Sequence, residues 1–141
     1  MYDFIQKLHS GWAYVVLLFL ILAVINAFIG FSSKKTFSGK DRTIYLLAML
    51  FTHFQLLIGM VLYFVSPLGK ASFGQMGNAP LRLTSLEHPL VNIIAIILIT
   101  IGWSKHKRLN DSQAKFKTFI IFYGIGLLLL LSRIPWELWF R

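Results

Sequence analysis

Four histidines are the side chains in this sequence best suited to chemistry: His9, His53, His88 and His106. Neutral imidazoles on facing elements of a helical bundle can hold the iron of a b-type haem from its two sides. His9 stands just before the first long apolar run, and His88 stands at the start of the third. Successive crossings place these two at the same depth, so we predict that they ligate one haem. Ligation involving His53, or no cofactor at all, are the alternatives.

Basic side chains at the same end are suited to neutralise haem propionates. Arg133 closes the fourth apolar run, and Arg82 and Lys70 lie in the segment before the third. We predict that Arg133 contributes to cofactor binding. The alternatives are an interfacial arginine whose guanidinium reaches the headgroups, or an ion pair with Glu87 or Glu137.

A second group of polar side chains lies deeper in the apolar runs. His53 precedes the end of its run by twelve residues, which places it about 18 Å below that end at 1.5 Å per residue. We expect it to face Asn26, Gln55 or Asn92, in a cluster that binds a ligand or holds helices together. His53, Gln55 and Asn92 would surround a quinone head group. His106, between two lysines, is expected to be solvated.

Several kinds of chemistry are disfavoured by composition. The chain has no cysteine, which excludes disulfides, thiolate metal sites, iron–sulfur clusters and covalently attached haem. Within the apolar runs there is no aspartate or glutamate, whereas small proton-coupled exporters generally need a carboxylate at membrane depth. No hydrolase or transferase motif is present, so enzymatic activity would have to come from a bound cofactor.

The elements that must position these residues are membrane spans. Apolar residues make up 57% of the chain, charged residues only 13%, and the mean hydropathy is +0.70, whereas soluble domains carry about 25% charge. We predict an all-α, integral membrane four-helix bundle of up-down-up-down topology, forming a single domain over residues 1–141. The four predicted spans are approximately residues 11–31, 44–66, 86–104 and 116–134.

Small residues and one irregular segment complete this architecture. The stretch 67–80 holds three glycines and two prolines, so we expect a loop that covers one end of the bundle as a lid. Close helix contacts are expected at small residues. The candidates are Gly59, Ala95, Gly102, Gly124 and Gly126.

The net charge of +9 is explained by loops rather than by nucleic-acid binding. Residues 31–42 and 104–117 hold four and five Lys/Arg, nine in all, against five elsewhere in the chain. Short basic loops stay on the cytoplasmic side and meet anionic lipid. We therefore expect both termini and the 67–87 loop to lie on the outer side, and we expect no nucleic-acid partner.

Three segments resemble small four-helix bacterial membrane families such as SirB and YisL, and short proteins labelled cytochrome b-like. They are Leu8-His9-Ser10-Gly11-Trp12, Thr52-His53-Phe54-Gln55-Leu56-Leu57-Ile58-Gly59 and Ser132-Arg133-Ile134-Pro135. The resemblance implies a multi-pass protein of the bacterial inner membrane, with haem suspected and with His9, His53, His88 and Arg133 as the positions to carry over. A di-haem cytochrome would need two histidine pairs at two depths. This chain supports one haem at most.

The sequence thus predicts an inner-membrane protein that binds b-type haem and transfers electrons. Two alternatives belong to other classes. A cofactor-free accessory or assembly subunit would bind membrane-protein partners, or a second copy of itself, through its aromatic and glycine-rich surfaces. A quinone- or lipid-binding protein would use His53, Gln55 and Asn92 to hold a neutral head group.

Overall fold

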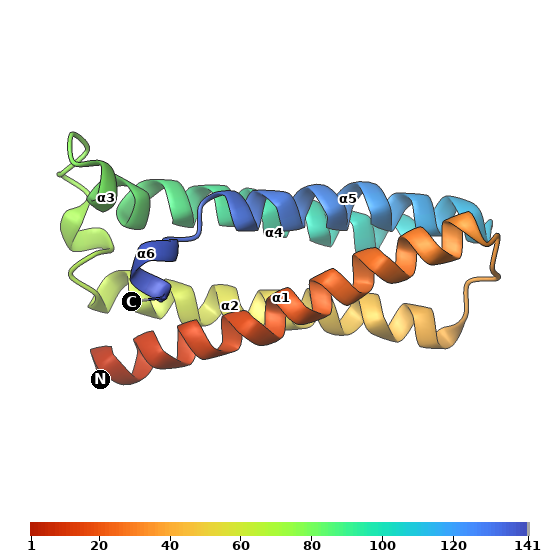
Figure 1. Ribbon diagram of the computed structural model, residues 1–141, viewed down its shortest axis with the longest axis horizontal. Coiled ribbons are helices and arrows are strands. Elements are labelled where there is room, and N and C mark those ends of the chain that lie inside the picture. Colours follow the sequence, from red (N-terminus) through yellow and green to blue (C-terminus); the bar gives the residue numbers. More distant parts are fainter. Residues whose placement is uncertain (141) are drawn as a thin grey trace.

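The computed structural model describes residues 1–140 and consists almost entirely of helices (Figure 1). The elements are α1 (Tyr2–Ser32), α2 (Gly39–Val65), the 3-10 turn η1 (Lys70–Ser72), α3 (Ala79–Arg82), the π-helical turn η2 (Leu83–Glu87), α4 (His88–His106), α5 (Ser112–Ser132) and α6 (Trp136–Trp139). Because α3, η2 and α4 join without a break, residues 79–106 form one continuous helix.

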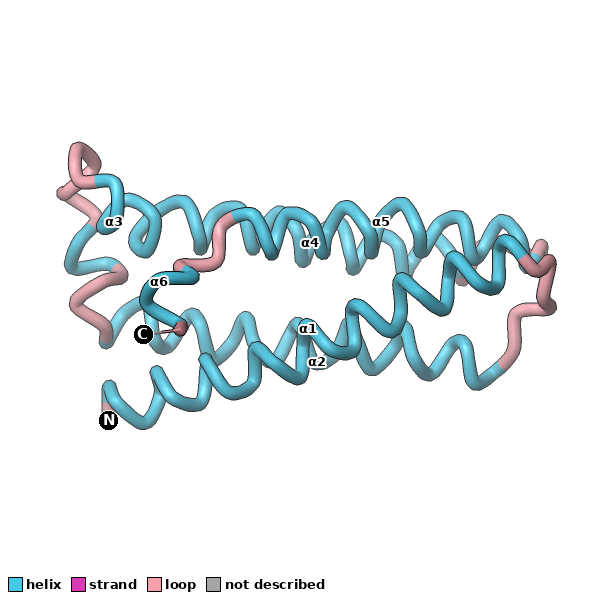
Figure 2. Tube along the Cα trace, in the orientation of Figure 1, coloured by secondary structure: helices cyan, strands magenta, loops and turns pink. Residues whose placement is uncertain are grey.

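The long helices lie side by side in a bundle whose two ends differ. Helix α1 contacts α2 and α5, and α4 contacts α5 and α2. Figure 2 shows the connections 33–38 and 107–111 at one end, opposite the irregular segment 66–78. We call the first end the basic end, because residues 31–42 and 104–117, which include these connections, carry nine of the fourteen Lys/Arg residues. The other end, where α1 begins and α6 lies, is called the cavity end (Figure 1).

Four helices are long and apolar enough to cross a membrane: α1, α2, the 79–106 helix and α5. Large apolar side chains point outward on each of them. Examples are Leu18 and Phe28 of α1, Leu57 and Phe64 of α2, Ile97 and Ile101 of α4, and Ile125 and Leu128 of α5. Hydrocarbon, rather than water, is the solvent that suits such a surface.

Each predicted span overlaps one of these helices, but every helix begins before its span, and α2 and α5 end at Val65 and Ser132, before the predicted ends at 66 and 134. Polar caps extend α2, the 79–106 helix and α5 beyond their apolar runs, whereas α1 begins after Met1 without a side-chain cap. Helix α2 starts with a capping box in which Ser38 and Asp41 each accept a hydrogen bond from the other's backbone amide. Asp111 caps α5 in the same position. Asp41 of α2 and Glu87 of the 79–106 helix lie in the polar extensions that precede the apolar runs.

An aromatic cluster fills the interior on the basic side. The rings of Tyr45 and Phe119 stack with centres 3.7 Å apart, and the Tyr123 hydroxyl donates to the Tyr45 carbonyl at 2.7 Å. His106 packs against Trp103 and Phe119 and is only 2% exposed. The prediction that His106 is solvated is wrong, because the last turn of α4 directs its ring inward while the neighbouring lysines face outward.

Most, but not all, of the predicted glycines lie at close contacts between helices. A methyl group added at Gly102 or Gly126 would lie 2.6 to 2.7 Å from a side chain of the facing helix, and one at Gly59 would lie 3.1 Å from an imidazole. At Gly124 it would meet nothing within 4 Å, so that prediction is wrong. Gly30, which was not predicted, lies directly under a phenylalanine ring.

Candidate functional site

A cavity of about 520 Å³ lies inside the bundle at the cavity end. Side chains from all four long helices, from the segment 66–73 and from α6 line it. Most of the lining is apolar, and among the described residues that form it there is no lysine, arginine, aspartate or glutamate. The site is therefore a neutral chamber with a few polar groups, which suits a largely apolar ligand.

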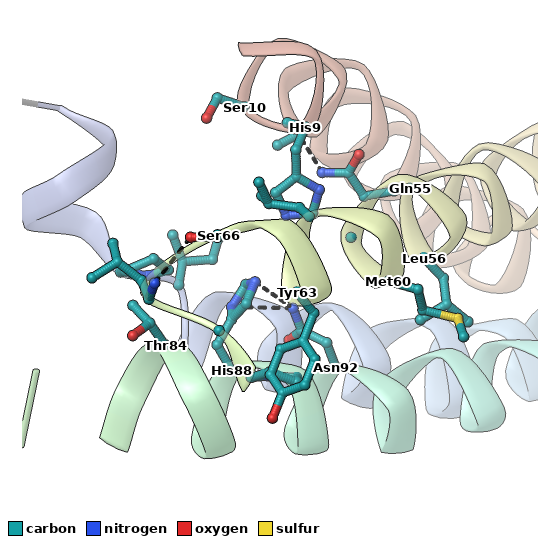
Figure 3. Close-up of a pocket in the computed structure, with 18 of the residues that line it drawn as sticks. His9, Ser10, Gln55, Leu56, Met60, Tyr63, Ser66, Thr84, His88 and Asn92 are labelled. Carbon is teal, nitrogen blue, oxygen red and sulfur yellow. Dashed lines mark hydrogen bonds between the residues drawn. The ribbon is translucent and has the colours of Figure 1, made fainter. Parts of the chain in front are cut away.

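The cavity contains the pair of histidines that the sequence placed at one depth. His9 of α1 and His88 of α4 lie with ring centres 6.2 Å apart and ring planes at 88°. Figure 3 shows the two rings pointing toward one another from opposite walls. The predicted juxtaposition of His9 and His88 is confirmed, and it arises because α1 continues past its apolar run to include His9.

The ring of His88 is held by a backbone carbonyl. Its Nδ1 lies 2.9 Å from the carbonyl oxygen of Arg133, which can only accept, so Nδ1 carries the proton and Nε2 has the free lone pair. The side-chain amide nitrogen of Asn92, one turn further along α4, lies 3.2 Å from Nδ1 and 3.3 Å from Nε2. Because Nδ1 carries the proton, only Nε2 can accept from this amide. Arg133 is the C-cap of α5, where the chain leaves the helix toward Pro135. The end of α5 therefore orients an imidazole on α4.

His9 is positioned by α2. Gln55 donates from Nε2 to the His9 backbone carbonyl at 2.7 Å, which aligns the two helices. The imidazole lies against Gly59, where an added Cβ would be 3.1 Å from Cε1 of the ring. The absence of a side chain at position 59 thus makes room for the ring.

Polar atoms without partners gather around the same cavity. Within residues 1–140, the buried side-chain nitrogen and oxygen atoms that lack a hydrogen bond are His9 Nδ1, Gln55 Oε1, Asn92 Oδ1 and Trp139 Nε1. All four residues line the cavity. A buried polar group left unpaired costs about 1–3 kcal/mol, so their convergence points to a ligand with polar atoms of its own. Sequence analysis did not identify Trp139 as a candidate site residue.

His53 has a different role from the predicted one. Its Nε2 lies 2.8 Å from the Thr100 hydroxyl, which links α2 to α4, and it does not line the cavity. Asn26 donates to Asp41 and to the Tyr45 hydroxyl toward the basic end. The predicted cluster of His53 with Asn26, Gln55 and Asn92 is therefore wrong, because helix rotation turns these side chains to different neighbours.

Arginines lie at the rim of the cavity rather than in its wall. Arg82 Nε is 2.9 Å from one carboxylate oxygen of Glu87, and Arg133 Nε is 3.8 Å from the other. The alternative prediction of an Arg133–Glu87 ion pair is confirmed. Two guanidinium groups share one carboxylate, which leaves the rim with a net charge of +1. Lys70, the third basic residue considered, lies 5.5 Å from the centre of the Phe64 ring.

No family model, curated protein or solved structure matches this chain. The site therefore has to be interpreted from its own geometry.

Proposed function

We propose that the chain is a bacterial inner-membrane protein that crosses the bilayer four times in an up-down-up-down arrangement, with both termini outside. The four long apolar helices support insertion. Their connections alternate between the ends of the bundle, and the basic loops gather at one of them, which supports a cytoplasmic basic end. The cavity then opens near the outer face.

In that setting the cavity would hold one b-type haem through His9 and His88, and the protein would take part in electron transfer. The observation that best supports this proposal is the facing pair of imidazoles. A metal–imidazole bond is about 2 Å long, and the bonded nitrogen lies about 1 Å from the centre of its ring. Two imidazoles that bind one metal from opposite sides should therefore have ring centres about 6 Å apart. The observed separation is 6.2 Å. A bound haem would supply reversible one-electron chemistry at iron.

The surrounding residues are suited to this ligand. The proton on His88 Nδ1, held by the Arg133 carbonyl, leaves Nε2 available as a ligand atom. Gln55 holds the backbone of His9, and Gly59 leaves room for its ring. Apolar walls would keep water away from a metal held by the two imidazoles. The net positive rim formed with Glu87 suits the negative charge of two propionates.

The test is the visible spectrum of detergent-purified protein, oxidised and then reduced with dithionite, with haem quantified as pyridine haemochrome. We expect about one haem per chain and sharpened α and β bands on reduction. His9→Ala and His88→Ala should each lose the chromophore. His53→Ala is the matched control, since His53 does not line the cavity, and it should keep its haem.

Other outcomes separate the alternatives. A colourless wild-type protein, folded and expressed with ample haem, would refute haem binding. Co-purification of a defined membrane protein with such a colourless chain would favour the accessory-subunit function. Full haem occupancy in both His9→Ala and His88→Ala would show that the ligand assignment is wrong.

A further inference from the structure

Two elements cover parts of the cavity. The segment 66–73 covers its outer end, with Leu68 and Phe73 in the lining. Helix α6 covers the side between α1 and α5, where the Trp139 ring lies 4.7 Å from that of Tyr14 (Figure 1). Between α2 and α4, by contrast, four apolar side chains of the lining are strongly exposed.

Apolar side chains on this side face both the cavity and the surroundings of the protein. Met60 and Phe64 of α2, and Leu90 and Ile93 of α4, all line the cavity. They are nevertheless 50%, 64%, 50% and 42% exposed. Residues that line a chamber and are also exposed on the outer surface mark its opening. We call this opening between α2 and α4 the portal.

Two hydrogen bonds between α2 and α4 bound the portal. On the basic side, His53 Nε2 and the Thr100 hydroxyl are 2.8 Å apart. On the outer side, the Tyr63 hydroxyl donates to the Ser85 carbonyl at 2.9 Å. That carbonyl is free because its partner in a regular helix would be the amide of residue 89, which is a proline. Ten residues of α2 separate the bonds, so the portal is about 15 Å long.

The chemistry of the cavity defines what can pass through the portal. An opening bounded by exposed apolar side chains on a membrane helix faces hydrocarbon, so the ligand must dissolve in the bilayer. A lining without formal charge disfavours a phosphate or carboxylate head group, whose burial without a partner is costly. A ligand that enters through the portal therefore has an apolar chain and a neutral head.

One unpartnered atom specifies the head group further. Viewed along the axis of α4, Asn92 faces a direction between that of His88 and that of Ile93 at the portal, because successive helix residues are about 100° apart. Its Oδ1 is buried and accepts no hydrogen bond. A hydroxyl group can donate to this oxygen, whereas a carbonyl cannot.

We propose that the portal admits a membrane quinol, whose hydroxyl donates to Asn92 and whose isoprenoid chain lies between Met60 and Ile93. The proposal rests on the membrane insertion proposed above and does not require haem. The oxidised quinone has carbonyls in place of hydroxyls, so its binding should be weaker by about fivefold, the value of one hydrogen bond.

The experiment is calorimetric titration of detergent-purified protein with decylubiquinol, kept reduced by dithionite, and with decylubiquinone. Met60→Trp and Ile93→Trp narrow the portal and should weaken quinol binding at least tenfold. Leu50→Trp and Ile101→Trp are the controls: they lie on the same helices but on the basic side of the His53–Thr100 bond, are 46% and 44% exposed, and do not line the cavity. They should bind as the wild type does. Asn92→Leu should abolish the preference for quinol over quinone.

Haem content is measured on every sample as pyridine haemochrome, which separates the two proposals. Portal-dependent quinol binding in a haem-free protein would support the quinol site and refute the haem. Undetectable quinol binding, or equal weakening by portal and control variants, would refute the quinol site whatever the haem content. Binding of dioleoylglycerol but not of decylubiquinol would also refute it, since the site would then take a different neutral lipid.

Discussion

Position 59 offers a direct test of how the histidine pair is positioned. In Gly59→Ala, the new Cβ would lie 3.1 Å from Cε1 of His9 and 3.6 Å from Nδ1. The ring must therefore move by a few tenths of an ångström. Alanine in place of glycine stabilises a helix by about 1 kcal/mol, and the crowding offsets part of this gain. We expect little net change in stability and a measurable loss of haem occupancy or a shift in its reduction potential.

The control for this substitution is Gly124→Ala on α5. Nothing lies within 4 Å of a Cβ at that position, so the variant should gain up to about 1 kcal/mol and keep its haem unchanged. Stability is measured by unfolding in mixed micelles, and haem by its visible spectrum and redox titration. Equal stability gains and identical haem properties in Gly59→Ala and Gly124→Ala would refute the conclusion that position 59 controls the His9 ring.

Three further substitutions test other parts of the structure. Trp139→Phe removes a buried N–H that lacks a partner, so the ligand-free protein should be as stable as the wild type or more so in thermal unfolding, while ligand retention in extraction assays falls. The control is Trp136→Phe, which removes an exposed hydrogen bond to the Leu131 carbonyl, so stability should fall slightly and ligand retention should not change. Asp41→Ala should lower the free energy of unfolding in micelles by about 1–2 kcal/mol, because it removes a helix cap and the partner of an exposed lysine. An unchanged unfolding midpoint would contradict this. His53→Ala should speed backbone amide hydrogen exchange in the middle of α2. Thr100→Val should have the same effect, because it removes the same His53–Thr100 hydrogen bond.

Much of the architecture could be predicted from local sequence. Apolar runs locate membrane helices because hydrocarbon burial depends on each residue's own side chain, and a fixed rise per residue converts position into depth. That is why His9 and His88 could be placed together before their distance was known. Helix beginnings were predicted poorly, since capping by Ser38 and Asp111 extends α2 and α5 into polar sequence.

The predictions that were wrong concern which way a side chain faces. His106 was expected in water and lies in the aromatic core, while His53 was expected in a polar cluster and instead bonds Thr100. Gly124 was expected at a helix contact and faces open space. In each case the depth along the helix was correct or nearly so, and the rotation about the helix axis was unknown.

Local sequence was thus enough to predict the number of long helices, their order, and the depth of the histidine pair. Only the folded chain shows that the Arg133 carbonyl orients His88, that Trp139 lines the cavity, and that exposed apolar side chains line it between α2 and α4. The physical reason is that helices which are apolar on all faces have no amphipathic pattern to fix their rotation. Their orientation is set by packing against neighbours, at glycines and a few hydrogen bonds that are distant in sequence.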